Sequence, residues 1–209
     1  MTNLMTRIST HSPIRLALLG AVVLTTVTGC PAPEPGYPRV DPSPAAACGA
    51  TTPMNNTEVQ AKAKASIVRV VANRATGTGF VLKTGNKIQV VTNYHVIREG
   101  TAFKAVLDTA GGNAEISLKV AMVDIKNDLA ILEAPAIGAL NNALEINPSG
   151  VQLGQSVAAM GYPYVSGSSD FTLTFEPGSV SAVRRKIQDR EFVQTNANIN
   201  PGNSGGPVL

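Results

Sequence analysis

Residues 67–93, "IVRVVANRATGTGFVLKTGNKIQVVTN", carry a strong strand signal. Three runs within them, "IVRVV", "GFVL" and "IQVVTN", are rich in Val and Ile, and short segments containing Gly, Asn or Thr separate these runs. β-branched residues favour strands, and turn-forming residues between short strands favour antiparallel neighbours. The segment "LKTGNK" places Thr-Gly-Asn between two of the runs and predicts a hairpin.

Runs of the same kind continue toward the C-terminus at short intervals. They are "FKAVL", "ISLKVAMV", "LAILEA", "QSVAAMG", "FTLTF", "SVSAV" and "FVQT". A short helix, "EVQAKAKAS", is expected before them, starting near Glu58. Many short strands with little helix between them predict an all-β fold of antiparallel barrels or a sandwich. The composition agrees, since 44% of the residues are apolar, 15% are charged and there is no Trp.

The first 29 residues have the pattern of an export signal. Arg7 and Arg15 flank its start, "LALLGAVVL" forms an apolar core, and "VTGC" ends it. The apolar stretch is shorter than the ~20 residues that a membrane-spanning helix needs. The small residues before Cys30 resemble the lipobox of bacterial lipoproteins, which implies cleavage before Cys30 and lipid attachment to it. Pro31, rather than Asp, follows the cysteine, and in Gram-negative lipoproteins this favours the outer membrane as the destination. The alternative is an ordinary secretory signal and a Cys30–Cys48 disulfide; the small-residue and cysteine combination favours lipidation.

Residues 30–57 are predicted to be an extended tether, and residues 58–209 a single folded domain. The segment "PAPEPGYPRVDPSPAAACGATTP" has many prolines and few bulky apolar side chains, so it favours a spacer over packed structure. Such a spacer would hold the domain away from a membrane surface.

The net charge gives no support for nucleic-acid binding. The chain has 17 basic and 14 acidic residues, and two of the basic residues, Arg7 and Arg15, lie in the leader. The remainder has 17 − 2 = 15 basic against 14 acidic residues, a net charge of +1. Only residues 184–186, "RRK", form a basic cluster, and so short a run is usually a solvated strand end or turn.

Three residues in the predicted domain form a candidate catalytic set. His95 is the only histidine outside the leader; Asp128 precedes an apolar run, and Ser204 lies in "GNSGG". Each residue alone has an ordinary structural explanation, as an exposed histidine, a strand-ending aspartate or a turn serine. As a set, the three residues supply what nucleophilic catalysis by serine needs. The serine needs an imidazole to remove its proton, and the imidazole needs a carboxylate to fix its tautomer. The order His, Asp, Ser in a β-rich chain is that of chymotrypsin-type enzymes.

The sequence resembles a trypsin-like serine peptidase of the HtrA/Deg branch from about Ile67 to its end. The matching segments, in order, are "TGTGFVL", "VTNYHVI", "DIKNDLAIL", "VAAMGYP", "FEPGSVSAVRR" and "QTNANINPGNSGGPVL". In the third segment the family's second aspartate is catalytic, so the resemblance favours Asp128 over Asp124. It implies two antiparallel six-stranded β-barrels of the chymotrypsin type.

The resemblance also implies a role for each site residue. His95 would be general base and then general acid, Asp128 would orient it, and Ser204 would form the acyl-enzyme. The N–H groups of Gly202 and Ser204 would form the oxyanion hole. By resemblance Asn198 stands at the base of the primary specificity pocket. It is not a carboxylate, so cleavage after Lys or Arg is not expected, and the branch's preference for small or medium apolar residues is expected instead.

The chain departs from the family pattern in several places. Asn196 occupies a position where the branch usually has Asp, and Asn198 one where a small or apolar residue is common; both affect substrate preference but not the triad. The strand and hairpin that follow "GNSGGP" in the family are missing, so the second barrel is expected to be truncated at its C-terminus and its edges unpaired. The polypeptide is therefore expected to be a fragment or to fold poorly alone, and these residues are expected to lack the PDZ domain often found in this branch.

The leading hypothesis is a serine endopeptidase acting on proteins or peptides in the cell envelope, tethered to a membrane through Cys30. The alternative is a catalytically inactive lipoprotein of the same fold that binds proteins. A purely structural envelope protein would explain neither the glycines around Ser204 nor the order of the three residues. One histidine and two separated cysteines predict no metal site, and no segment predicts a cofactor.

Overall fold

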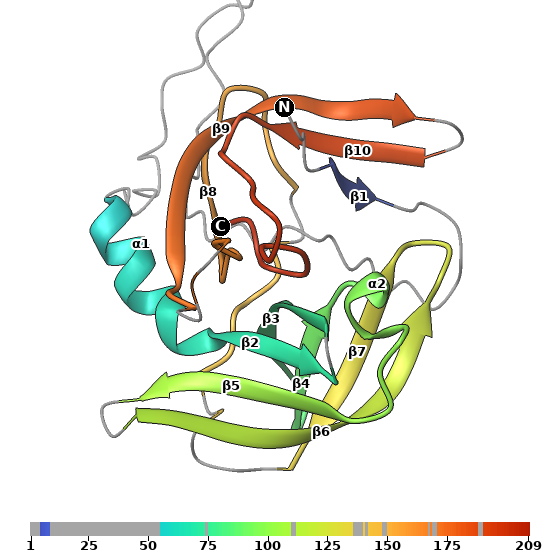
Figure 1. Ribbon diagram of the computed structural model, residues 1–209. Coiled ribbons are helices and arrows are strands. Elements are labelled where there is room, and N and C mark those ends of the chain that lie inside the picture. The colour runs from blue at the N-terminus through green and yellow to red at the C-terminus, as the bar shows by residue number, and fades with distance from the viewer. Residues whose placement is uncertain are drawn as a thin grey trace, which may run out of the picture.

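The computed structural model shows an all-β protein with two sheets (Figure 1). It describes residues 5–8 and 55–209, apart from 74, 110–111, 136–139, 141, 148–149, 167, 169–170 and 188–189. The predicted lipidation site Cys30, Cys48 and most of the predicted tether lie outside the described residues. No helix among the described residues is long and apolar enough to cross a membrane.

The first sheet is a closed six-stranded antiparallel barrel with the order β2-β3-β4-β7-β6-β5. Its strands are β2 (Ile67–Ala72), β3 (Ala75–Thr84), β4 (Lys87–Thr92), β5 (Phe103–Thr109), β6 (Gly112–Asp124) and β7 (Leu129–Ala134). The hairpin predicted from "LKTGNK" is confirmed between β3 and β4, where Gly85 has a φ of 59°. All three strands predicted in residues 67–93 belong to this barrel.

Strands β3 and β4 are buried on both faces. Val81 pairs with Val90, and both side chains belong to the core inside the barrel. The neighbouring pair, Phe80 and Val91, faces the opposite way because side chains alternate along a strand. This outer pair packs in a second core with Met160 of the other sheet. Burial on both faces explains why these strands read as nearly continuous apolar runs.

The second sheet has four antiparallel strands in the order β1-β10-β9-β8. They are β1 (Met5–Ile8), β8 (Ser156–Gly161), β9 (Thr174–Ile187) and β10 (Arg190–Thr195). The chain end also pairs with β8, since Ala158 and Leu209 exchange two backbone hydrogen bonds of 2.8 Å. The prediction of two six-stranded barrels is therefore confirmed for the first barrel alone. β1 lies within the residues predicted to form the leader.

β9 corrects one detail of the predicted strand pattern. Residues 171–175 and 179–183 were expected to form separate strands, but Phe171–Leu173 lie outside any strand and β9 runs on from Thr174 to Ile187. Its first half pairs with β8 and its second half with β10. Pro177, which has no N–H to donate, pairs only with β8, before pairing to β10 begins at Val180. The change of partner lets one strand contain the proline.

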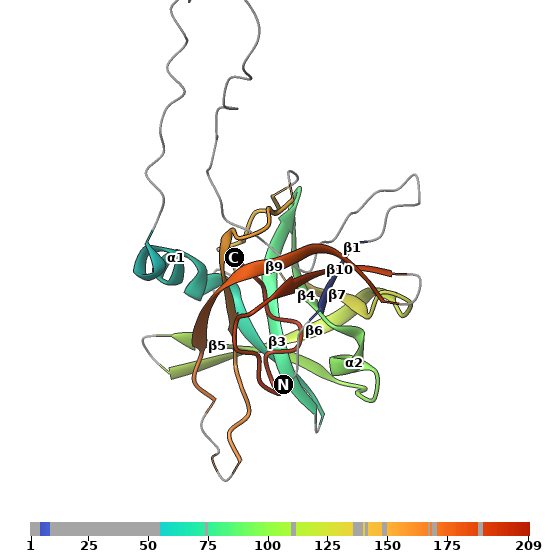
Figure 2. The same ribbon diagram turned by 90° about the horizontal axis from the view of Figure 1, so that it is seen from above.

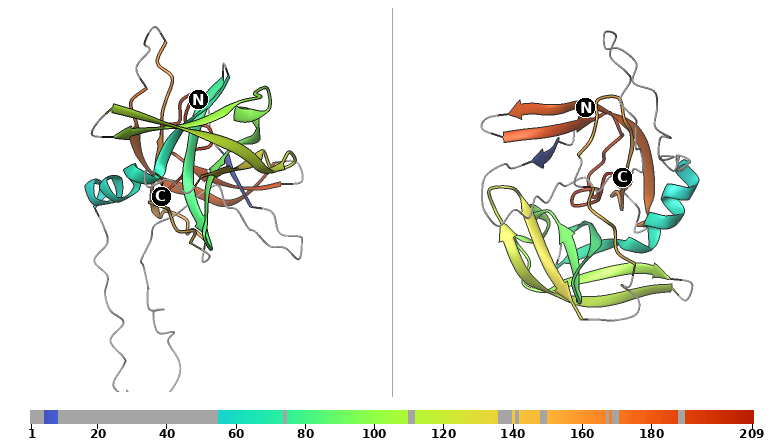
Figure 3. Two further views of the ribbon diagram at one scale, coloured as in Figure 1. Left: turned by 90° about the horizontal axis from the view of Figure 1, so that it is seen from below. Right: turned by 180° about the vertical axis from the view of Figure 1, so that it is seen from behind.

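The predicted helix near Glu58 is confirmed as α1 (Asn56–Ala63), followed by a 3-10 turn at Lys64–Ser66. A capping box starts α1: the Asn55 side chain accepts from the Glu58 N–H at 3.0 Å, and the Glu58 carboxylate accepts from the Asn55 N–H at 3.0 Å. Ala63, at the end of α1, is buried in the core between the two sheets. Figures 2 and 3 show α1 at one side of the molecule.

Tyr162 contributes a hydroxyl group to this inter-sheet core. Its hydroxyl donates to the Ile67 carbonyl at 3.5 Å. Burial, reinforced by the negative charge of Asp108, raises the pKa of Tyr162 to about 12, and Arg69 only partly offsets this. The phenol therefore stays neutral at physiological pH. The segment that follows Tyr162 leads to the candidate site between the two sheets.

Candidate active site

His95 lies on α2 (Tyr94–Ile97), a single helical turn directly after β4. Val96 and Ile97 are buried in the barrel core and fix this turn, while His95 lies on the outer side with 43% of its side chain exposed. Asn93 occupies the N-cap position but does not cap the helix with its side chain. The Asn93 amide instead donates to the Asp128 carbonyl at 2.8 Å.

Asp128 lies in the turn between β6 and β7 and has a left-handed backbone, with a φ of 53°. Aspartate is one of the few residues other than glycine that adopt this conformation readily. Four hydrogen bonds join Asp128 to residues 93–95: its carbonyl accepts from Tyr94 N–H at 3.1 Å and from Asn93, and its carboxylate accepts twice from His95. The starts of β7 and α2 are thereby held together.

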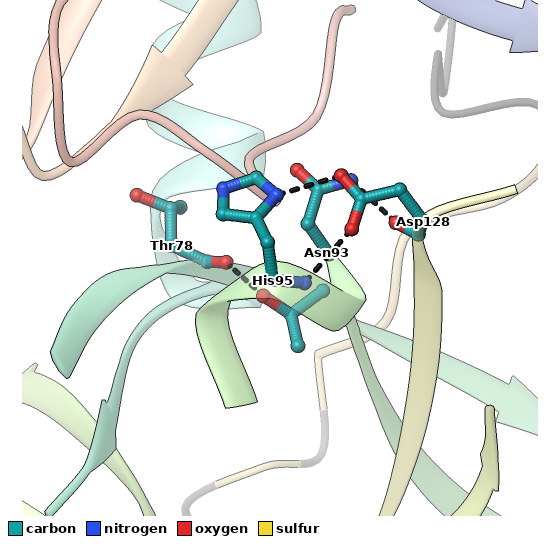
Figure 4. A network of polar contacts seen from close by, with 5 residues as sticks. Thr78, Asn93, His95 and Asp128 are labelled. Carbon is teal, nitrogen blue, oxygen red and sulfur yellow. Dashed lines mark hydrogen bonds and ion pairs between the residues drawn. The ribbon is translucent and has the colours of Figure 1, made fainter. Parts of the chain in front are cut away.

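The carboxylate of Asp128 accepts hydrogen bonds from two groups of His95, as Figure 4 shows. Oδ1 accepts from the His95 backbone N–H at 2.8 Å, and Oδ2 lies 2.6 Å from Nδ1 of the ring. An ionised carboxylate can only accept hydrogen bonds, so Nδ1 must carry the proton in this contact. The neutral imidazole then has its lone pair on Nε2, the tautomer that a general base requires.

Asp128 is held in the ionised form. Burial alone would raise the pKa of its carboxyl, but the hydrogen bonds from the His95 ring and backbone, with the charges of His95 and Arg98, outweigh burial and lower it. The side chain is 42% exposed, so solvent screens part of this interaction. The direction of the shift is the one that keeps an acceptor opposite Nδ1 at neutral pH.

The other aspartate of the same segment has a different partner. Both carboxylate oxygens of Asp124 accept from Asn127, one from its backbone N–H at 2.9 Å and one from its side-chain amide. Asp124 therefore shapes the turn that presents Asp128 and makes no hydrogen bond to His95. Within the part of the chain that the structure describes, no three His, Cys, Asp or Glu side chains form a potential metal site.

Residues 201–206 form the loop around the predicted nucleophile Ser204, called the nucleophile loop below, which lies between the barrel and the second sheet (Figure 1). Gly205 has a φ of 84°, and a Cβ there would collide with the Thr78 carbonyl and the Thr92 hydroxyl and lie 2.9 Å from Asn93 N. The chain after Ser204 thus passes directly against the segment that leads into α2. Only glycine combines this backbone conformation with so close an approach.

Gly202 is equally constrained. Its φ is 99°, and a Cβ there would meet the Tyr162 carbonyl and lie 2.7 Å from Tyr164 N. The peptides on either side of Asn203 are also tied, because the Asn203 N–H donates to Asn200 O at 3.1 Å and Gly206 N–H donates to Asn203 O at 2.9 Å. The loop is therefore a tightly packed turn. The Asn203 amide is buried, and neither of its polar atoms has a partner among the described residues.

The structure brings His95 and Asp128 into direct contact and packs the Ser204 backbone against the same region. The Ser204 carbonyl accepts from the Thr78 N–H at 2.8 Å. In the described part of the chain, Ser204 Oγ and His95 Nε2 form no hydrogen bond, and the N–H groups of Gly202 and Ser204 also have no acceptor. Asn198, the residue assigned to the specificity pocket, is exposed.

Three residues of this region were missed by sequence reasoning. Asn93 fixes Asp128, Thr92 donates to the Thr78 carbonyl at 2.7 Å, and Thr78 contacts the nucleophile loop. All three lie in the segments "TGTGFVL" and "VTNYHVI", whose match to the family was evident. A threonine flanked by glycines in a buried strand was the signal, but the partners of its hydroxyl are more than 80 residues away.

Comparisons with known proteins place this geometry in a family. A model of the "Trypsin-like peptidase domain" matches residues 77–209. Protease Do-like 1, chloroplastic, of Arabidopsis thaliana is 38% identical over 148 residues, which cover 65% of this chain and 30% of that protein. A probable periplasmic serine endoprotease, DegP-like, of Bartonella henselae is 35% identical over 138 residues, covering 65% of this chain and 25% of its own. The crystal structure of Deg5 superimposes with a TM-score of 0.61 at 32% identity, covering 74% of this chain and 78% of that one.

The chain belongs to the trypsin-like peptidase family, and its relatives are the HtrA/Deg serine proteases. Its barrel and second sheet are similar to those of a chymotrypsin-like HtrA structure. The family supports a protease function. The matched region spans less than a third of the length of the two curated relatives named above.

Proposed function

We propose that the protein is a serine endopeptidase in which Ser204, His95 and Asp128 form the catalytic triad. The observation that carries the proposal is the Asp128 carboxylate bound to both the backbone N–H and Nδ1 of His95. That contact fixes the ring orientation and leaves Nε2 as the basic nitrogen. The His95 side chain is 43% exposed, so its ring is open to solvent and to a substrate.

Gly202 and Ser204 are proposed to supply the oxyanion hole. In a trans peptide the N–H points away from the preceding carbonyl. The carbonyl before Gly202 is fixed because Pro201 O accepts from Tyr164 N–H at 2.7 Å, and the carbonyl before Ser204 is fixed by Gly206. Both N–H groups are thereby held in set directions without an acceptor of their own, as preorganised donors must be.

The reaction follows from these groups. His95 Nε2 takes the proton of Ser204 Oγ as the oxygen attacks the substrate carbonyl carbon, and the oxyanion that forms is stabilised by the two N–H groups. His95 then gives this proton to the leaving amine as the peptide bond breaks, which leaves an acyl-enzyme on Ser204. A water molecule attacks the ester, His95 again takes and returns a proton, and the carboxylic acid product leaves.

Substrate preference is proposed to depend on Asn198. It offers a neutral amide where a carboxylate would select Lys or Arg, so small or medium apolar residues are the proposed preference. Asn196 has a structural role, because its Oδ1 accepts from Ser179 N–H at 2.7 Å and its own N–H donates to Ser179 O at 3.2 Å. This reciprocal contact ties the chain before Asn198 to β9. Protein or peptide substrates in the cell envelope are proposed, in keeping with the periplasmic relative.

We also propose that residues 1–29 are a lipoprotein-type signal, that Cys30 is the lipidated N-terminus of the mature protein, and that residues 30–57 tether the domain 58–209 to the outer membrane. Growth with radioactive palmitate is expected to label the protein, and Cys30→Ser to abolish the label while Cys48→Ser retains it. An unlabelled wild-type protein in the membrane fraction would rule the lipid anchor out.

A fluorophosphonate probe tests the peptidase proposal, because it reacts with activated serines and needs no knowledge of the substrate. The wild-type chain is expected to be labelled at Ser204, and Ser204→Ala to remove the label. Ser166→Ala, a matched change at an exposed serine in the loop after β8, is expected to leave labelling unchanged. Label that survives Ser204→Ala would refute the assignment.

The missing hydrogen bond between Ser204 and His95 favours a second candidate, a protein-binding module without activity. Such hydrogen bonds are often long before substrate binds, so this observation does not outweigh the His95–Asp128 contact. A folded wild-type protein that takes up no probe but binds unfolded casein would support the second candidate.

A further inference from the structure

Thr78 lies at the centre of the contact between the barrel and the nucleophile loop. It is located in β3 between Gly77 and Gly79 and is completely buried. Each of its polar atoms is hydrogen-bonded, and every partner comes from another part of the chain. No step of the proposed reaction uses it.

The hydroxyl of Thr78 joins two segments that meet at the nucleophile loop. Oγ1 accepts from the Tyr162 N–H at 2.9 Å and donates to the Gly202 carbonyl at 2.7 Å. A hydroxyl has one proton, and the carbonyl of Gly202 can only accept. The direction of both hydrogen bonds is therefore fixed, and the hydroxyl cannot turn away without leaving two polar groups unpaired.

The backbone of Thr78 connects the same loop to the histidine segment. Its N–H donates to Ser204 O at 2.8 Å, and its carbonyl accepts from Thr92 Oγ1 at 2.7 Å. Thr92 is itself buried and ends β4, three residues before His95. Thr78 therefore connects the backbone of Ser204, the proposed nucleophile, to Thr92 in the segment that leads to His95, the proposed base. Figure 4 shows Thr78 beside α2, which carries His95.

We propose that the Thr78 hydroxyl is a positioning group for the oxyanion hole, a role that rests on the proposed peptidase function. Gly202 has no side chain to limit its backbone, so the peptides around it depend on hydrogen bonds for their orientation. Tyr164 holds the peptide before Gly202, and Thr78 holds the peptide after it. Loss of the hydroxyl removes one of the two hydrogen bonds that orient the Gly202–Asn203 peptide and leaves the longer one, from the Asn203 N–H to Asn200 O at 3.1 Å. The loosened peptide then lets the adjoining N–H of Ser204 shift from its direction.

Two substitutions separate the hydroxyl from the packing of this side chain. Thr78→Val keeps the branched shape and removes both hydrogen bonds. Thr78→Ser keeps the hydroxyl and removes the methyl group, which lies 3.1 Å from where a Cβ on Gly206 would be. If Thr78 acts through its hydrogen bonds, Thr78→Ser keeps the activity and Thr78→Val loses it. If Thr78 acts only through packing, Thr78→Val keeps the activity and Thr78→Ser loses it.

Steady-state cleavage of a fluorogenic peptide by the full chain is expected to show the difference. Thr78→Val should lower kcat by about 10²-fold with KM within about twofold of wild type, because a displaced donor weakens the transition state more than substrate binding. Thr78→Ser should stay within about threefold of wild-type kcat. The pH profile should keep its shape, since the His95–Asp128 pair is untouched. Equal kcat values for wild type and Thr78→Val would overturn the proposal.

The rate of hydrogen–deuterium exchange at the backbone amides of residues 201–206 tests the same positioning role and does not depend on catalytic activity. It is expected to accelerate about tenfold or more in Thr78→Val but not in Thr78→Ser. Thr195→Val is the matched control: Thr195 is also buried, and its hydroxyl accepts from Ala197 N–H at 3.1 Å without a described hydrogen bond to the loop. Unchanged exchange in a folded Thr78→Val protein would refute the positioning role, whereas a wild type inert to peptides and probe would refute only the peptidase proposal.

A second variant covers the case in which Thr78→Val does not fold. Thr78→Cys keeps a weaker hydrogen-bonding group and is expected to give a kcat between those of wild type and an inactive variant. A wild-type kcat in Thr78→Cys would again overturn the positioning role.

Discussion

Ser204→Ala is expected to lower kcat for peptide cleavage by about 10⁶-fold. The alanine leaves the loop backbone and the two proposed oxyanion donors in place, since Ser204 Oγ has no hydrogen bond to another described group. The substitution therefore removes the nucleophile and little else. Its unfolding midpoint in urea should match that of the wild type.

The same experiment tests whether Ser204 and His95 act as one unit. His95→Ala alone should also cost about 10⁶-fold, and the double variant should lose hardly more than either single variant. Independent contributions would instead multiply. A multiplicative loss in the double variant would show that His95 does not activate Ser204, and measurements of kcat with a fluorogenic peptide at saturating concentration decide between these outcomes.

The strands could be predicted from sequence because their physical cause is local. Short apolar runs bounded by turn residues locate β2 to β8 and β10, and the segment "EVQAKAKAS" locates α1 and the 3-10 turn after it, although α1 begins at Asn56, two residues before the expected start. What could not be predicted is pairing between distant strands, such as β4 with β7 or β2 with β5, which closes the barrel. Alternating apolar positions reveal that a strand has a buried face but not which partner covers it.

β9 shows where local signals mislead. Pro177 and Gly178 interrupt an apolar pattern and indicate a break, yet the strand continues through them. The break is only a change of partner, from β8 to β10, and a missing N–H has no effect on the side that is unpaired. The sequence alone carries no record of which side of a strand is paired at a given residue.

The candidate site divides in the same way. His95, Asp128 and Ser204 could be selected because each bears distinctive chemistry within a family pattern. Thr78, Thr92 and Asn93 could not be assigned roles, because threonine and asparagine are common and their hydrogen bonds here go to backbone groups that only the fold brings near. Functional side chains are thus more visible in sequence than the groups that hold them.

Asp128→Asn is the second large effect expected, and its cause is the tautomer of His95. In the wild type, Oδ1 accepts from the His95 backbone N–H and Oδ2 accepts from Nδ1–H. The backbone N–H can only donate, so the single oxygen of the new amide must stay opposite it. The amide NH₂ then faces Nδ1, which has to become an acceptor, and the ring proton moves to Nε2.

With its proton on Nε2, His95 can no longer take the proton of Ser204. A loss in kcat of about 10⁴-fold is expected, while KM and the unfolding midpoint at neutral pH change little. Asp124→Asn is the matched control, because it makes the same chemical change four residues away in a carboxylate that accepts from Asn127 and makes no described hydrogen bond to His95. Its kcat should remain within about tenfold of wild type. If Asp124→Asn proves as damaging as Asp128→Asn, the turn as a whole, rather than the carboxylate at His95, sustains activity, and the triad assignment of Asp128 fails.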